Sequence, residues 1–132
     1  MGMKYLKNLA SVSLITSLLL GCGGGSSSGV SVNLAGSWSG SWKSSDGQGG
    51  ALTTSFSQTG ATFSGPATIY NSYCFGYEYA TGKLNGSNIE IGIASNAIIL
   101  IGSVSGSTIS GTYYVYSGAC TGDAGTFVLS RS

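Results

Sequence analysis

The side chains that could do acid–base, nucleophilic or metal chemistry are few in this chain of 132 residues, and they lie far apart. There is no histidine, and the four carboxylates are those of Asp46, Glu78, Glu90 and Asp123. Glu78 and Glu90 could converge across neighbouring strands as a hydrolase pair, although solvated charges are the commoner outcome. Asp46 and Asp123 are expected in turns as local caps, and clusters of metal-ligating residues are absent from the sequence. We therefore expect no enzyme activity, no metal site and no cofactor.

The most unusual side chains are aromatic, and they lie close to two cysteines. The tyrosine-rich segment 70–79 contains Cys74, and a second such segment, 113–116, precedes Cys120. Tyrosine supplies rigid, amphipathic contact area that suits recognition of a sugar, an apolar small molecule or a protein surface. The candidate ligand-binding residues are therefore Tyr73, Phe75, Tyr77, Tyr114 and Tyr116. The alternative is that these rings cap the end of the fold and fill strand positions.

Composition favours strands and turns and argues against a polyanionic partner. The chain has 23 glycines, one proline and only 7% charged residues, whereas 42% of its residues are hydrophobic. If Lys4 and Lys7 are removed with a leader peptide, three cations and four anions remain, a formal net charge of −1. Such a surface has no field to attract a polyanion, so we expect no nucleic-acid partner.

The first thirty residues have the layout of an export signal followed by a spacer. Lys4 and Lys7 precede an uncharged apolar run over residues 9–20, which is shorter than the roughly 20 residues that a membrane-spanning helix needs. The glycine- and serine-rich segment 23–29 is typical of a flexible linker. We expect a signal peptide over residues 1–21, a tether over 22–33 and a folded domain over 34–132.

The residues Leu19-Leu20-Gly21-Cys22 resemble the lipobox of bacterial lipoprotein signals, in which the cysteine becomes lipidated. The resemblance implies a thioether-linked diacylglycerol and an amide-linked acyl chain on Cys22. Two or more acyl chains anchor a protein stably, so the membrane is an expected partner. By the sorting rule of such lipoproteins, Gly23 implies the outer membrane if the host has one. The expected location is the bacterial cell envelope.

From residue 30 onward, glycine recurs about every ten residues, and apolar residues alternate with polar ones between the glycines. The clearest case is segment 34–44, which places on one face Leu34, Gly36, Trp38, Gly40 and Trp42. Pro66 has the opposite parity to its apolar neighbours, which suggests a sheet edge or a bulge. About eight short strands joined by brief turns predict an all-β fold, an antiparallel up-and-down β-barrel. A two-sheet β-sandwich is the alternative.

Cys74 and Cys120 are expected to form a disulfide, because an exported domain is in an oxidising setting. They lie in the third and seventh connections of the predicted meander, and odd-numbered connections all emerge at the same end. The bridge therefore falls at one mouth of the barrel and both termini at the other, while two free thiols are the alternative. The side chains expected inside the barrel are Trp38, Trp42, Phe56, Phe63 and Tyr113. The two tryptophans are expected to fill its floor.

Residues 34–38, Leu-Ala-Gly-Ser-Trp, resemble the G-x-W motif in the first strand of calycin-like barrels, the lipocalins and avidins. Residues 109–113, Ile-Ser-Gly-Thr-Tyr, are similar to the G-x-Y strands of avidins. The whole domain also resembles small uncharacterised bacterial lipoproteins built on repeated glycine–aromatic strands. These resemblances imply a barrel and small-molecule binding, but the biotin-binding residues of avidin cannot be placed on this sequence.

The expected function is that of a lipid-anchored envelope protein whose barrel is a non-catalytic binding or structural module. Its partner would be a small apolar molecule, a sugar or a protein, recognised at the aromatic, disulfide-linked mouth. The alternative is a periplasmic protease-inhibitor barrel, in which segment 26–33 would enter the protease cleft. A membrane-spanning barrel is disfavoured by the outward faces of the strands, which are rich in serine and threonine.

Overall fold

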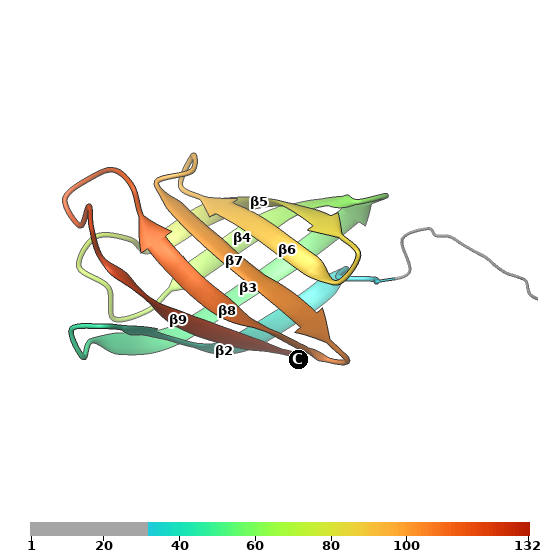
Figure 1. Ribbon diagram of the computed structural model, residues 1–132, viewed down its shortest axis with the longest axis horizontal. Coiled ribbons are helices and arrows are strands. Elements are labelled where there is room, and N and C mark those ends of the chain that lie inside the picture. The colour runs from blue at the N-terminus through green and yellow to red at the C-terminus, as the bar shows by residue number, and fades with distance from the viewer. Residues whose placement is uncertain (1–31) are drawn as a thin grey trace, which may run out of the picture. The chain divides into compact units, whose positions relative to one another are not determined.

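The computed structural model describes residues 32–132, which form a closed antiparallel barrel of eight strands (Figure 1). In chain order the strands are β2 (Gly36–Ser44), β3 (Gly49–Thr59), β4 (Thr62–Ile69), β5 (Tyr77–Asn85), β6 (Asn88–Ile93), β7 (Ile98–Ser105), β8 (Thr108–Val115) and β9 (Ala124–Arg131). Each strand pairs with the next, and β9 pairs with β2 to close the sheet. The predicted up-and-down barrel is therefore confirmed, and the sandwich alternative is wrong.

The predicted signal peptide and the lipidation site at Cys22, with Gly23 and most of the tether, lie outside the described residues. The compact unit begins at Val32, whose side chain packs against the core. Residues 32–132 contain no helix that is both long and apolar enough to cross a membrane.

The period-two pattern places alternate side chains in the barrel interior, as it must when a sheet closes on itself. All the aromatic side chains that the sequence places inside are buried there: Trp38, Trp42, Phe56, Phe63 and Tyr113. The rings of Phe56 and Phe63 meet edge to face, with centroids 4.8 Å apart. Burial of such rings, together with that of the surrounding leucines and isoleucines, stabilises the domain.

Gly40 explains how two tryptophans fit on one short strand. It faces the interior between Trp38 and Trp42, and a Cβ atom there would lie 1.9 Å from the carbonyl oxygen of Val128 in the neighbouring strand β9. The absence of a side chain therefore lets β2 and β9 approach closely and leaves interior space for the two indole rings. This is the physical reason for the second glycine, Gly40, in the sequence GSWSGSW of residues 36–42.

Pro66 does not mark an edge or a bulge, and that expectation is wrong. It lies in β4 opposite Tyr79 of β5, inside a barrel that has no free edge. The pairing between β3 and β4 keeps one register throughout, so no residue is inserted, but it lapses between Thr54 and Ser57. That gap lies opposite Pro66, where the missing N–H removes a donor from the ladder. A closed barrel tolerates the lapse because the other side of β4 remains paired.

The connections alternate between the two ends of the barrel. One end carries the tight turns that follow β3, β5 and β7, together with Val32 and Ser132, and we call it the closed end. The other carries the connections over residues 45–48, 70–76, 94–97 and 116–123, and we call it the mouth. Figure 1 shows the longer connections gathered at the mouth, on the left of the view.

The closed end is covered by the segment 32–35, which two side chains hold in place. Gln58 accepts a hydrogen bond from the Leu34 N–H at 2.6 Å and donates one to the carbonyl of Val32 at 2.9 Å. Arg131 donates to the carbonyls of Asn33 and Ala35. These bonds satisfy backbone groups that would otherwise be left unpaired at the end of the barrel.

Candidate ligand-binding site

A disulfide between Cys74 and Cys120 joins the two longest connections of the mouth. The Cα atoms lie 6.2 Å apart, and 46 positions separate the residues in the sequence. The predicted bridge is therefore confirmed, and it lies at the end opposite Val32 and Ser132, the ends of the described part of the chain. Because it ties connection 70–76 to connection 116–123, the bridge limits how far the mouth can open.

A cavity of about 60 Å³ opens at the mouth, between the inner faces of the strands and the two bridged connections. Its walls are mostly apolar and include Trp42, Leu52, Ile98, Leu100 and Phe127. Its rim is formed by residues of the connections, including Tyr73, Phe75 and Cys120. The two cysteines of the bridge therefore differ. Cys120 lines the cavity, whereas Cys74 does not, although its sequence neighbours Tyr73 and Phe75 do.

Trp42 belongs to this cavity, and the expectation that both tryptophans fill the floor is wrong for it. Four residues along a strand span about 13 Å, so one strand places Trp38 near the closed end and Trp42 near the mouth. The Trp42 Nε1–H donates to the carbonyl of Tyr70 at 2.9 Å, and its ring meets that of Tyr113 edge-on at 6.3 Å. Trp38 is 1% exposed and its Nε1–H donates to the carbonyl of Leu34 at 2.9 Å.

A polar network connects three segments at the rim of the cavity. The carboxylate of Asp123 accepts one hydrogen bond from the hydroxyl of Ser44 and another, at 3.0 Å, from that of Tyr113. The Ser44 hydroxyl also accepts the N–H of Asp46 at 3.2 Å. Burial, followed by the hydrogen bond to Asp123, raises the pKa of Tyr113 to about 12. The Tyr113 hydroxyl therefore stays protonated and donates to the carboxylate at neutral pH.

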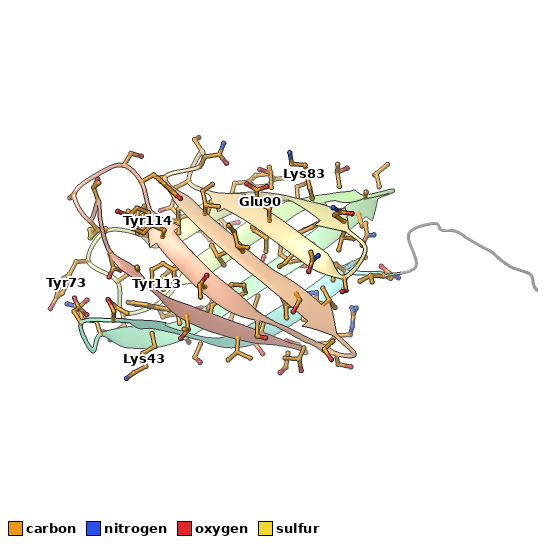
Figure 2. The ribbon with its side chains drawn as sticks, in the orientation of Figure 1. Lys43, Tyr73, Lys83, Glu90, Tyr113 and Tyr114 are labelled. Carbon is orange, nitrogen blue, oxygen red and sulfur yellow. A yellow bond between two sulfur atoms is a disulfide. The ribbon has the colours of Figure 1, made fainter. Side chains whose placement is uncertain are left out.

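The structure divides the five predicted ligand-binding residues into two groups. Tyr73, which is 90% exposed, and Phe75, which is half-buried, line the cavity. Tyr77, Tyr114 and Tyr116 do not line it, because strand alternation points the first two outward and Tyr116 follows the end of β8. The rings of Tyr114 and Tyr116 instead contact each other at 4.7 Å, and Figure 2 shows Tyr114 on the outer face of the barrel.

Sequence reasoning missed Asp123 and Ser44 as members of the site, because the sequence indicates Asp123 as a turn cap and Ser44 only as the last residue of the alternating segment 34–44. The available signal was the inward parity of Ser44, which has the parity of Trp38 and Trp42, and the position of Asp123 directly before a strand that pairs with β2 and β8. Reading that signal required the register of β9, which places Lys43 opposite Thr126 and brings Ser44 to the start of that strand.

The one carboxylate pair that the sequence suggested is not formed. Glu78 is the second residue of β5, at the mouth, and its carboxylate accepts the N–H of Gly76 at 3.2 Å. Glu90 lies opposite Lys83 in the pairing of β5 with β6, and both side chains project from the outer surface (Figure 2). Residues 32–132 also contain no group of three or more carboxylates or thiols placed to hold a metal ion.

The fold and the site define a small closed β-barrel with a disulfide-linked, aromatic mouth. Among solved structures it is similar to a redesigned β-barrel, b11L5F_LGL, with a TM-score of 0.55 and 16% identity over 75% of this chain and 91% of that one. It is also similar to EF1p2_mFAP2b bound to DFHBI, with a TM-score of 0.53 and 18% identity over 75% of this chain and 94% of that one. At these identities the similarity shows the fold alone. No protein-family model and no curated protein matches the sequence.

Proposed function

We propose that this chain is a lipid-anchored protein of the bacterial cell envelope, of the calycin-like type, whose barrel binds a small ligand without transforming it. The observation that carries the binding role is the cavity at the mouth, lined by apolar and aromatic side chains with a few polar groups at the rim. Concave, mostly apolar sites with a few fixed polar groups are typical of small-molecule binding.

The size of the cavity limits how a ligand would bind. A water molecule needs about 10–15 Å³ of such space, so a cavity of about 60 Å³ admits a short apolar group but not a whole drug-sized molecule. The rest of a ligand would lie against the rim, where Tyr73 offers exposed aromatic area beside the half-buried ring of Phe75. The proposed mode is therefore insertion of one end of the ligand.

A closed barrel of this kind is able to hold a small molecule. The structurally similar protein EF1p2_mFAP2b is described as bound to DFHBI. The barrel sheet is hydrogen-bonded all the way round, so it supplies a rigid wall, and the disulfide constrains the rim. Rigid walls reduce the entropy that a ligand must remove on binding.

The envelope location rests on Cys22 and the signal-like residues before it, and the disulfide supports it because such bonds persist outside the cytosol. Expression of the full chain with labelled palmitate tests this part. We expect label and membrane association in the unmodified chain and neither in Cys22→Ala. Ser26→Ala, a change in the same tether, is the control and should keep both. Membrane association that survives in Cys22→Ala would contradict the lipid anchor.

The binding role is tested by thermal-shift measurements of the full chain against a panel of metabolites, short amines, fatty acids and glycans. Tyr73→Ala removes an exposed ring at the rim of the cavity, so it should reduce ligand-induced shifts while leaving the melting temperature without ligand nearly unchanged. Tyr77→Ala removes a ring of similar exposure that does not line the cavity, and it should keep the shifts. If no compound stabilises the unmodified chain, the binding role fails.

The protease-inhibitor alternative has less support. It would need segment 26–33 to be free to extend into a protease cleft. The two described residues of that segment are held at the closed end, where the carbonyls of Val32 and Asn33 accept hydrogen bonds from Gln58 and Arg131. Releasing them would break these bonds and uncover the core around Leu34, which is fully buried.

A further inference from the structure

The cavity at the mouth has a single charge on its wall. Of the described residues that line it, Asp123 is the only charged one, so a carboxylate faces the space without a lysine or arginine beside it. Lys43 directly follows Trp42, which lines the cavity, in the sequence. Because Trp42 faces inward, Lys43 points outward, as Figure 2 shows. Its positive charge is directed away from the cavity.

The carboxylate of Asp123 is oriented but not saturated. Each of its oxygens accepts one hydrogen bond, from Ser44 on one side and from Tyr113 on the other. A carboxylate offers about four lone-pair positions, so acceptor capacity remains for a further donor. Both donors are neutral hydroxyls, so the negative charge is held in place at the rim without being neutralised.

Aromatic rings surround the same space. Trp42, Tyr113 and Phe75 all line the cavity, and the faces of such rings attract cations at distances up to about 6 Å. An anionic ligand would meet both these faces and the charge of Asp123 unfavourably. A neutral ligand would shield the carboxylate from water without replacing the lost hydration.

We propose that the ligand is a small organic cation, a short alkylammonium whose apolar end enters the cavity and whose ammonium group donates to Asp123 at the rim. This inference rests on the proposed binding role and deepens it. The cavity of about 60 Å³ is smaller than the roughly 150 Å³ that accommodates benzene, which favours a short aliphatic chain over an aromatic one.

The positions of the carboxylate and of the apolar wall also favour a free amine over a lysine side chain of a partner protein. Asp123 lies in a connection at the rim, whereas the apolar wall is formed by strand residues such as Leu100 and Phe127. The apolar end of a ligand must therefore enter first. A lysine side chain carries its ammonium group at the free end, so it would have to bring the charge into the apolar part.

Three probes of matched shape test the proposal on the full chain, isolated from membranes in detergent: n-butylammonium, 1-butanol and butanoate. Binding is followed through the indole N–H resonance of Trp42, at the mouth, with that of Trp38, at the closed end, as the internal reference. We expect n-butylammonium to shift the Trp42 resonance alone and to bind about tenfold more tightly than 1-butanol, with butanoate weakest.

The variant Asp123→Asn keeps the size of the side chain and one of its two acceptor oxygens, replaces the other oxygen by an amide donor, and removes the charge. It should lower the affinity for n-butylammonium about tenfold, so that this affinity comes within about twofold of the affinity for 1-butanol. Asp46→Asn removes the same charge from a neighbouring turn that does not line the cavity, and it should change the affinity less than about twofold. An equal loss in both variants would mean a diffuse field and would overturn the assignment to Asp123.

The outcomes separate this inference from the proposed function. If 1-butanol or butanoate binds as tightly as n-butylammonium, the cation inference fails while the binding role stands. If none of the three probes and no compound of the panel shifts Trp42, both fail. N-acetyllysine amide should bind no better than n-butylammonium, and markedly tighter binding would identify a protein partner instead. Because the probe comparison uses the unmodified chain, it decides the question even if Asp123→Asn does not fold.

Discussion

The two ends of this barrel are built from the same eight strands, yet one is packed shut and the other is hollow. At the closed end Trp38 is buried against Leu34, and the guanidinium of Arg131 lies 4.4 Å from the centre of its ring. At the mouth Trp42 keeps 9% of its surface exposed and borders a cavity. Two tryptophans with the same parity on one strand therefore have different surroundings: Trp38 is packed in the closed end, and Trp42 lines the cavity.

The difference comes from what covers each end. The closed end has tight turns and a short covering segment whose backbone groups find partners in Gln58 and Arg131. The mouth has longer connections, which a disulfide ties together across the opening and of which only some side chains, such as Phe75 and Cys120, pack against the core. The cavity thus lies where the interior side chains stop filling the barrel, under the connections of the mouth.

The largest expected effect is on the closed end. Trp38→Ala should lower the free energy of unfolding by about 3–5 kcal/mol, because it removes a fully buried ring and its contacts. Trp42→Ala should cost at least about 1 kcal/mol less, because one side of that ring already faces open space. Chemical denaturation of the full chain measures both. If the alanine variants do not fold, phenylalanine is substituted at each position, and the loss of free energy of unfolding should again be larger at Trp38 than at Trp42. Equal losses would contradict the difference in packing between the two ends.

Removing the disulfide should act on the mouth. Replacing both Cys74 and Cys120 by serine should lower the free energy of unfolding by about 2–4 kcal/mol, since the bridge closes a loop of 46 residues. Hydrogen exchange should rise in the connections 70–76 and 116–123 and stay unchanged around Leu34. Increased exchange at the closed end as well would mean that the two ends unfold together and are not independent regions.

How much of this could be predicted from the sequence follows from what each feature depends on. The barrel and the disulfide depend on local alternation and on the order of the strands, and both were predictable from segments such as 34–44. The position of Trp42 at the mouth depends on where along β2 each end closes, which the alternation does not encode. The contact between Ser44 and Asp123 joins residues 79 positions apart and requires the register of β9.

The cavity was not predictable for a related reason. Its volume is the difference between the interior space and the side chains that fill it, so it depends on strand tilt and on the loop conformations at the rim. Tyr73 and Tyr77 are both tyrosines within three residues of Cys74, yet only Tyr73 lines the space. Strand alternation points Tyr77 of β5 outward, whereas Tyr73 lies in connection 70–76, whose conformation is set by the bridge and by its backbone partners.

Two glutamines at opposite ends of β3 allow the closed end and the mouth to be compared through smaller losses of stability. Gln58→Ala should cost about 1–2 kcal/mol, because it leaves the Leu34 N–H without the acceptor it has at 2.6 Å. Gln48→Ala, in the turn at the mouth, should cost less than about 0.5 kcal/mol, because this exposed side chain only borders the cavity. Both are read from denaturation midpoints. A larger loss for Gln48→Ala would reverse the assignment of the two ends.

The stability of the mouth should also depend on pH. Burial and the hydrogen bond to Asp123 raise the pKa of Tyr113 to about 12, whereas a tyrosine of the unfolded chain has a pKa of about 10. The folded state therefore holds this proton more tightly, so its contribution to stability is fully present below about pH 10 and is lost as the pH rises toward 12. Tyr113→Phe should flatten the decline between these values, measured by denaturation at each pH. Tyr114→Phe leaves the Tyr113 hydroxyl in place, so the free energy of unfolding should still decline between these pH values. A flattened decline in Tyr114→Phe would show that a tyrosine on the outer face, and not Tyr113 at the mouth, causes the pH dependence.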